Sequence, residues 1–125
     1  MDKYNFISDQ LRSIAVLYEL EEWTSNIKYP YWTGEFTEEP VMTEDGAEES
    51  TVILNGFNRG KAIDLVRDKE KIKQLFDPTD GLRAKTGSGS IAVFFDGSFS
   101  IPTGEADLKR MQINLKIKEW KGKGE

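Results

Sequence analysis

The sequence predicts an α+β fold in which two amphipathic helices pack on one face of a mainly antiparallel sheet. Two segments repeat apolar residues at helical spacing, other segments alternate apolar and polar residues, and turn residues separate them. The expected order is one helix, two strands joined by a long acidic loop, a second helix and three strands, α-β-β-α-β-β-β. With 125 residues, the chain is predicted to form one domain spanning residues 1–125.

The two helices are predicted from apolar stripes. The first is expected in residues 4–22, with a stripe formed by Ile7, Leu11, Ile14 and either Leu17 or Tyr18. The second is expected in residues 58–76 and ends at Asp77-Pro78, because proline cannot continue a helix. Its apolar face consists of Ala62, Leu65, Val66, Ile72 and Phe76.

Residues 29–36, YPYWTGEF, place four aromatic residues in eight positions. They fit either a packed strand or an aromatic platform for a ligand. Trp32, Gly34 and Phe36 alternate with more polar positions, and this period of two is typical of a strand. We therefore expect Trp32 and Phe36 to face the core and Tyr31 to remain half-exposed on the other side.

Three further segments have strand-like patterns. Residues 50–57 are β-branched and apolar, which favours a central strand with a candidate bulge at Asn55-Gly56. Residues 89–102 read as a hairpin whose two arms meet at an Asp96-Gly97 turn. Residues 111–120 alternate between apolar and polar positions, which predicts a strand with one solvated, basic face.

The segment between the two predicted strands, residues 37–49, is unusually acidic. It has six acidic residues, one Pro and one Gly, with Val41 and Met42 as its only sizeable apolar residues. Such a composition buries too little apolar surface to order itself, so a mobile loop is expected. Residues 121–125 are expected to form a flexible tail.

The composition excludes several kinds of catalytic and metal-binding site. The chain has no cysteine and no histidine, which excludes thiol nucleophiles, thiolate metal sites and catalysis by Ser-His or Cys-His pairs. A net charge of −5 disfavours non-specific nucleic-acid binding. No segment approaches the length of a membrane span, and the first residues lack a secretion signal. We therefore predict no catalytic residue, no cofactor and no metal site.

Two short motifs match known sites only in part. SNIK at residues 25–28 and KTG at residues 85–87 match two elements of penicillin-recognising serine enzymes, but the S-x-N motif between them is missing. GSGS at residues 87–90 precedes a strand, whereas a phosphate loop opens a helix. Both matches are interpreted as chance.

The charges are unevenly placed along the chain. Residues 35–49 contain seven acidic and no basic residues. Residues 109–123 contain six basic residues and one acidic residue, Glu119. One molecule is therefore predicted to carry two patches of opposite charge.

Three stretches resemble the small tail-completion proteins, also called tail terminator or head–tail joining proteins, of long-tailed bacteriophages and prophages of Gram-positive bacteria. These stretches are YPYWTGEF, EDGAEESTVILNGFNRGKAIDLVRDKEKIKQLF and IPTGEADLKRMQINLKIKEW, together about half of the chain. The resemblance implies an α+β fold and a structural protein without enzymatic activity. It also implies a ring, commonly a hexamer, that caps the tail tube and contacts the tail-tube protein and the head connector. Such a protein is expected in the bacterial cytoplasm during assembly and at the head–tail junction of the virion afterwards.

In that family the long loop between strands reaches a neighbouring subunit or the tube, and here it corresponds to residues 37–49. Head-to-tail rings join two different patches of one molecule. We therefore expect the acidic loop of one subunit to face the basic final strand of the next. The predicted interface residues are Tyr31, Glu38, Glu39, Val41, Met42, Glu44, Asp45, Glu48, Glu49, Lys116, Lys118 and Lys121.

Two other function classes remain open from the sequence. The acidic loop also suits an acidic binding module, such as an inhibitor, immunity protein or nucleic-acid mimic that acts on a basic partner. An enzyme that uses Asp, Glu, Lys or Tyr is a third class, which a cavity lined by carboxylates of perturbed pKa would favour.

Overall fold

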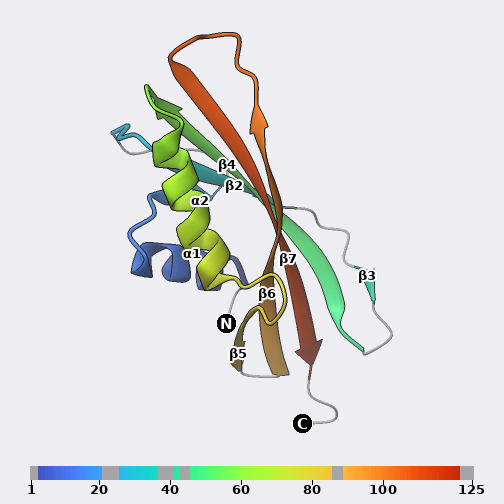
Figure 1. Cartoon of the computed structure of the whole chain (residues 1–125). Helices are drawn as coiled ribbons and strands as arrows, with labels where there is room; N and C mark the ends of the chain where they lie inside the picture. Colours follow the sequence, from blue (N-terminus) through green and yellow to red (C-terminus); the bar gives the residue numbers. More distant parts are fainter. Residues whose placement is uncertain (1–2, 21–25, 37–40, 43–45, 86–88, 122–125) are drawn as a thin grey trace.

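The computed structural model describes residues 3–20, 26–36, 41–42, 46–85 and 89–121 (Figure 1). It contains two helices and seven strands. In chain order they are α1 (Lys3–Ser13), β1 (Tyr18–Leu20), β2 (Tyr31–Phe36), β3 (Val41–Met42), β4 (Glu48–Arg59), α2 (Ile63–Leu75), β5 (Leu82–Lys85), β6 (Gly89–Ile101) and β7 (Leu108–Lys121).

The strands form one mixed sheet in the order β1-β2-β4-β7-β6-β5, and β3 pairs with the start of β4. Only the contact between β1 and β2 is parallel; the other strand pairs of the described sheet are antiparallel. The predicted α+β class is confirmed. The predicted element order is wrong, because β1 and β3 are two additional strands before α2.

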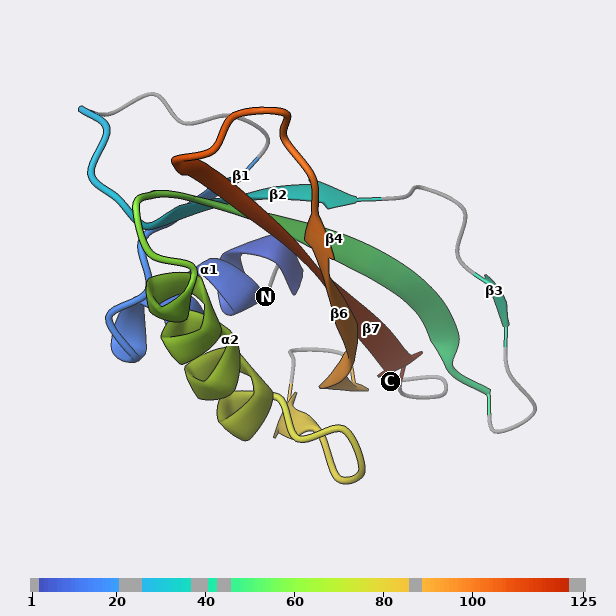
Figure 2. The same ribbon diagram turned by 45° about the horizontal axis from the view of Figure 1, so that its top comes forward.

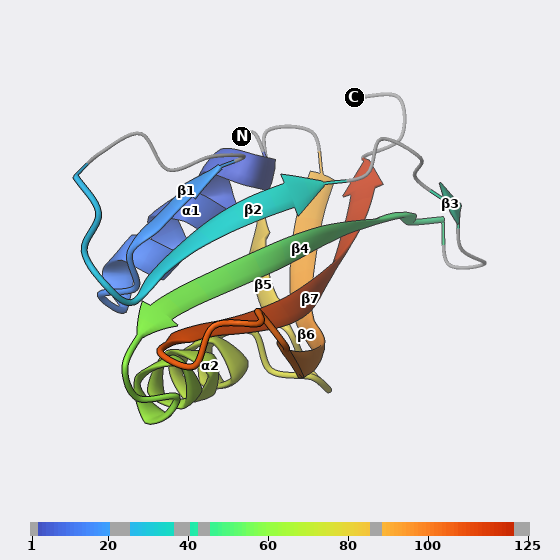
Figure 3. The same cartoon turned by 90° about the horizontal axis from the view of Figure 1, so that it is seen from above.

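The sheet is curled, and both helices lie on its concave side (Figures 2 and 3). Side chains from the two helices and from the inward-facing positions of the strands form one core. Its largest fully buried members are Trp32, Phe76, Ile7, Leu11, Leu54, Leu65, Ile72, Ile91, Ile113, Leu115, Ile117 and Val16. Within the described ranges, no helix covers the opposite, outer face of the sheet.

The first helix is shorter than predicted. It ends at Ser13, and Ala15 adopts a left-handed conformation with φ of 59°. The Ala15 N–H donates to the Arg12 carbonyl oxygen, and the Val16 N–H donates to the Leu11 carbonyl oxygen. This is the hydrogen-bond pattern of a Schellman motif, which closes a helix. Of the other positions in the predicted stripe, Ile14 and Leu17 lie in the connection after α1, and Tyr18 is the first residue of β1. Val16 and Tyr18 are buried, whereas Leu17 is exposed.

The interpretation of YPYWTGEF as a strand is confirmed. Trp32 is fully buried, Phe36 packs against the core, and Tyr31 is half-buried on the outer face. The candidate bulge at Asn55-Gly56 is wrong, because β4 pairs in regular register with β2 and with β7 through both residues. Gly56 lies directly opposite Trp32, and the missing side chain leaves room for the indole ring.

The predicted hairpin in residues 89–102 is also wrong. These residues form one strand, β6, and Asp96-Gly97 makes a bulge at which the register with β7 shifts. Gly97 has φ of 108°, a value that glycine adopts easily. Both halves of β6 pair with the long β7 instead of with each other. The antiparallel partner on the other side of β6 is β5, which the sequence did not predict.

The final strand follows its prediction closely, whereas the second helix begins at Ile63 rather than at residue 58, because Asn58 and Arg59 belong to β4. In α2, Leu65 and Ile72 are buried, and Phe76 is buried directly after the helix ends. Ala62, however, is exposed and Val66 is half-buried. In β7 the predicted alternation places Ile113, Leu115 and Ile117 in the core and their polar neighbours on the outer face.

The predicted mobile loop is in part regular structure. Val41 and Met42 form β3, and β4 begins at Glu48. These two strands pair with each other, so part of the segment that was expected to be a loop is a β-hairpin. Residues 37–40 and 43–45 lie outside the described residues. Of the predicted flexible tail, Lys121 is the last residue of β7, and residues 122–125 lie outside the described part.

Candidate functional site

The outer face of the sheet carries a row of large side chains that crosses four strands. The strand register aligns Tyr31 of β2, Phe57 of β4, Arg110 of β7 and Ile101 of β6. Residues paired in this way project on the same side of a sheet. The Tyr31 and Phe57 rings stack with 5.2 Å between their centroids, and the Arg110 guanidinium lies 5.6 Å from the centroid of Phe57. We call these four residues the outer row.

Arg110 is held by an amide rather than by a carboxylate. Its Nη2 donates to Asn55 Oδ1 at 3.0 Å, and Asn55 Nδ2 donates to Glu35 Oε1 at 3.2 Å. The Nε atom of Arg110 is buried and has no hydrogen-bond partner among the described residues. Asn55 therefore links a carboxylate to a guanidinium through its own amide group.

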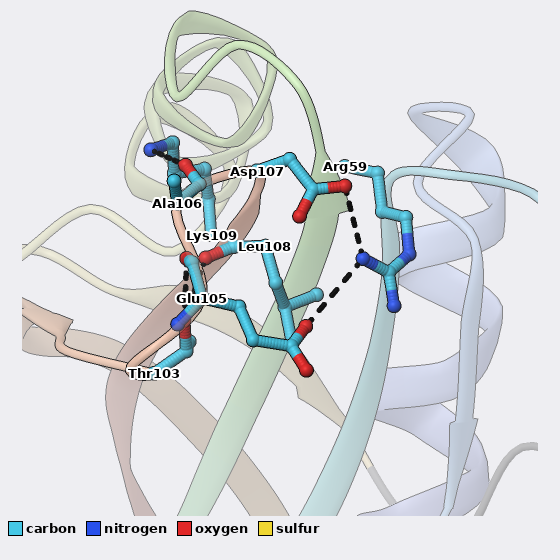
Figure 4. A network of polar contacts seen from close by, with 7 residues as sticks. All are labelled: Arg59, Thr103, Glu105, Ala106, Asp107, Leu108 and Lys109. Atoms are coloured by element: carbon cyan, nitrogen blue, oxygen red, sulfur yellow. Dashed lines mark hydrogen bonds and ion pairs between the residues drawn. The ribbon is translucent and has the colours of Figure 1, made fainter.

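Next to the outer row, Arg59 connects the end of β4 to the loop between β6 and β7 (Figure 4). Its Nη1 lies 3.1 Å from Asp107 Oδ2 and 3.6 Å from Glu105 Oε2. Hydrogen bonds to Tyr29 and Asp107 raise the pKa of Arg59 above its ordinary value. Thr103 shapes the same loop, since its hydroxyl lies 2.9 Å from the Leu108 carbonyl oxygen and accepts from the Glu105 N–H. These contacts fix the loop beside Tyr29 and Tyr31.

A cavity of about 340 Å³ lies between this loop and the start of α2. It is lined by Ala62, Leu65, Ser100, Ile101, Pro102, Thr103, Glu105, Ala106, Leu108, Lys109, Arg110 and Met111. Glu105 is the one carboxylate in this lining, and it contacts Arg59. The other ionisable side chains of this lining are Lys109 and Arg110, and both are basic.

The other end of β4 and β7 contains the predicted charged residues that the structure describes. Glu49 of β4 pairs in register with Lys118 of β7, and its Oε1 lies 3.8 Å from Lys116 Nζ. Glu48 lies opposite Glu119, whose carboxylate contacts Lys3 at 3.3 Å. Glu49, which was expected to face Lys116 and Lys118 of a neighbouring subunit, is thus a neighbour of both lysines within its own subunit.

The other predicted interface residues are placed only in part. Tyr31 belongs to the outer row, at the far end of β4 from Glu48 and Glu49. Val41 and Met42 form β3, and Lys121 ends β7. Glu38, Glu39, Glu44 and Asp45 lie outside the described residues. The interface itself stays a prediction.

A second group of outer-face residues, near the β5 edge, was not predicted from the sequence. The Arg83 guanidinium lies 5.8 Å from the centroid of Phe94 and 6.0 Å from that of Trp120. A cavity of about 330 Å³ beside them is lined by Arg83, Ala84, Lys85, Ser90, Ile91 and Trp120. The one available signal was the alternation in LRAK, which four residues make too short to predict a strand.

A buried carboxylate, Asp68, was also missed. Asp68 Oδ2 accepts a hydrogen bond of 2.9 Å from Trp32 Nε1 inside the core. Burial raises the pKa of Asp68, and the Trp32 hydrogen bond opposes this only in part. Burial likewise raises the pKa of Tyr18 to about 12. Both perturbed groups belong to the packed interior and line neither of the two cavities described above.

Two features are absent from the described residues. No group of three or more acidic side chains is arranged to hold a metal ion. Within the same ranges, no helix combines the length and the apolar content needed to cross a membrane. A comparison with protein-family models gives no match, and a comparison with curated proteins gives none either.

Proposed function

We propose that this chain is a non-enzymatic structural subunit of a long-tailed phage or prophage. Copies of it assemble into a ring, of hexameric order in keeping with the family it resembles, that terminates the tail tube and joins the tail to the head. Its partners are further copies of itself, the tail-tube protein and the head connector. It acts in the bacterial cytoplasm during assembly and afterwards at the head–tail junction of the virion.

The observation that supports this proposal best is the outer face of the curled sheet. The outer row places two aromatic rings, an arginine and an isoleucine across four strands on a face that no described helix covers. Tyrosine and arginine are enriched at protein–protein interfaces and at their hot spots. Tyr29 adds another ring, whose centroid lies 5.6 Å from that of Tyr31. Such a face suits a protein that binds other subunits.

The perturbed ionisable groups are consistent with the same interpretation. The raised pKa of Asp68 follows from its burial against Trp32, so a structural role explains it. The larger of the two cavities has one carboxylate, engaged by Arg59. The outer face of the sheet is therefore a better candidate for binding another molecule than a catalytic group of side chains is.

An early stop codon in this gene, in the source phage or induced lysogen, tests the proposal by electron microscopy. We expect full heads separate from unjoined or overlong tails, and joined particles when the gene is supplied in trans. Normal infectious particles from the stop-codon strain would contradict a role in tail completion. In that event, stoichiometric capture of a basic protein by the purified chain would favour the acidic binding module.

A further inference from the structure

The outer face of the sheet has a second region, formed by β5, the start of β6 and the end of β7, at the lower end in Figure 1. Three rows of paired residues cross it, and paired residues project on the same side of a sheet. From β7 to β5, the rows are Lys116 and Phe94; Lys118, Ala92 and Arg83; and Trp120, Ser90 and Lys85. We call the six large side chains in these rows the basic-aromatic patch: Phe94, Lys116, Lys118, Trp120, Arg83 and Lys85.

The basic-aromatic patch is positively charged, although the whole chain has a net charge of −5. Four of its six side chains are basic and none is acidic. Among the described residues of the same rows, β4 adds one acidic side chain, Glu49, which lies 3.8 Å from Lys116 Nζ. An ion pair at the surface contributes little, so Lys116 can exchange this carboxylate for another anion. The patch therefore suits an anionic partner.

A hollow lies inside the patch. Ser90 is small, and the register places it between Trp120 and Lys85. The cavity of about 330 Å³ at this point has Trp120, Ser90, Lys85 and Arg83 in its lining. The described lining thus combines an indole ring with two cations and includes no carboxylate. These are the groups that a flat aromatic ligand with a nearby negative charge requires.

Arg83 is held in position by its own subunit. Its Nε donates to the Asp80 carbonyl oxygen at 3.0 Å. The guanidinium lies 5.8 Å from the centroid of Phe94 and 6.0 Å from that of Trp120, distances at which a ring attracts a cation. Nucleic-acid bases stack on aromatic rings and on the guanidinium plane of arginine. The patch therefore offers three stacking surfaces with lysines around them.

The residue types of the patch favour a nucleic acid over a protein partner. The cores of protein interfaces are enriched in aromatic residues and arginine but depleted of lysine. The outer row has the first composition, whereas the patch has three lysines. Proteins that bind single strands without sequence preference combine basic residues along the backbone with aromatic side chains that stack on the bases. The patch has both on an uncovered sheet.

We propose that the basic-aromatic patch binds single-stranded nucleic acid. One base enters the hollow and stacks on Trp120, and a second base stacks at Phe94 and Arg83. Lys85, Lys116 and Lys118 contact the phosphates. Because stacking and phosphate contacts tolerate any base, the binding has little sequence preference. This activity is additional to tail completion and does not depend on it.

Fluorescence anisotropy of labelled oligonucleotides with the purified full chain tests the proposal. The probes are single-stranded dodecamers of thymidylate and of uridylate. At low salt, about 50 mM, we expect a Kd on the order of 1–10 μM that rises steeply as salt is added. A duplex of the same length should bind at least about fivefold more weakly, because its bases are already stacked on each other.

Trp120 reports the stacking directly. The chain has three tryptophans, and Trp32 is fully buried in the core. We expect the bound dodecamer to quench the tryptophan fluorescence of the natural protein, and the quenching to be lost in Trp120→Phe, which keeps a ring for the base. Trp120→Ala should bind about tenfold more weakly. Urea unfolding checks that both variants are folded. Full quenching in Trp120→Phe would overturn the placement of a base in the hollow.

Charge reversal tests the phosphate contacts. Arg83→Glu/Lys85→Glu is expected to weaken binding at least about tenfold. The matched control is Lys61→Glu/Arg67→Glu, which changes the net charge equally at exposed positions before and on α2, the helix that covers the concave side. The control should bind within about threefold of the natural protein, because distant charges are screened. Equal losses in both variants would overturn the assignment of the site to the patch.

Three further results would overturn the proposal. The first is no binding of either dodecamer at about 50 mM salt and about 100 μM protein. The second is a duplex that binds as tightly as the single strands. The third is competition by polyglutamate that equals competition by the dodecamer, charge for charge, because an acidic protein would then be the better partner.

These outcomes are separable from those of the stop-codon experiment. Unjoined tails together with no oligonucleotide binding would leave tail completion standing and remove the nucleic-acid site. Oligonucleotide binding together with normal stop-codon particles would establish the site and remove the role in tail completion.

Discussion

Replacement of Gly56 by alanine is expected to destabilise the protein by about 2–3 kcal/mol. A Cβ atom at this position would lie 2.6 Å from two carbon atoms of the Trp32 ring, closer than van der Waals contact allows. Trp32 is fully buried, so the ring has little room to move away. Overpacking of a core costs about 1–3 kcal/mol or more, which outweighs the gain from a less flexible unfolded chain.

Thermal and urea unfolding measure this effect, and a loss of that size lowers Tm by about 10 °C. The control is the same substitution in a Trp32→Phe background, where the smaller ring leaves space for the methyl group. There the added cost should fall below about 1 kcal/mol, so the two substitutions couple. An equal cost in both backgrounds would show that the indole ring is not the reason for glycine at position 56.

Asp68 is expected to respond in opposite ways to two substitutions. Asparagine keeps an oxygen that can accept from the Trp32 indole N–H and removes a buried charge, so Asp68→Asn should be as stable as the natural protein, or more stable, at neutral pH. Alanine leaves the buried N–H without its partner. Asp68→Ala should therefore be less stable than Asp68→Asn by about 1–3 kcal/mol.

The pH dependence of Asp68 has a defined sign. Burial raises the pKa of Asp68, so the folded state binds its proton more tightly than the unfolded state. The free energy of unfolding therefore loses a contribution from Asp68 as pH rises from about 4, the unfolded pKa, through the raised folded pKa. Relative to Asp68→Asn, the natural protein should be more stable in acid than at neutral pH.

Urea unfolding of the natural protein and both variants at about pH 4 and at neutral pH measures these differences. The Asp68→Ala/Trp32→Phe double variant is the control, because it removes both partners of the hydrogen bond. Measured against Trp32→Phe alone, the Asp68→Ala substitution should cost less than it does in the natural background. A stability difference between the natural protein and Asp68→Asn that stays constant across this pH range would contradict the assigned sign.

The parts of the fold that follow a single period over many residues could be predicted from the sequence. In β7, the alternation of Ile113, Leu115 and Ile117 with polar residues persists across the strand, and one face is buried as expected. In α2, Leu65 and Ile72 are separated by seven residues, which is two helical turns. Local pattern and tertiary burial agree in both elements.

The errors arise where one local pattern fits two structures. Leu17 and Tyr18 continue the stripe of α1, but alternation from Val16 to Tyr18 is equally visible and belongs to β1. An Asp-Gly pair suits a hairpin turn and a bulge alike, since both use a glycine with positive φ. The choice at Gly97 depends on the length of β7, which pairs with both halves of β6 and lies later in the chain.

The candidate surfaces were harder to predict than the core. Tyr31 was found because strand alternation alone places it outside. The outer row, in contrast, joins Tyr31 to Arg110 through strand pairs that are distant in the sequence. The same holds for Arg83 and Trp120, which meet only through β6.

Gold-labelled antibodies against this protein, applied to purified particles of the source phage and viewed by electron microscopy, test the central claim most directly. Our account predicts that the protein is a component of the particle and that the label lies at the junction between head and tail. Purified infectious particles without the protein, or label at another place on the particle, would contradict it.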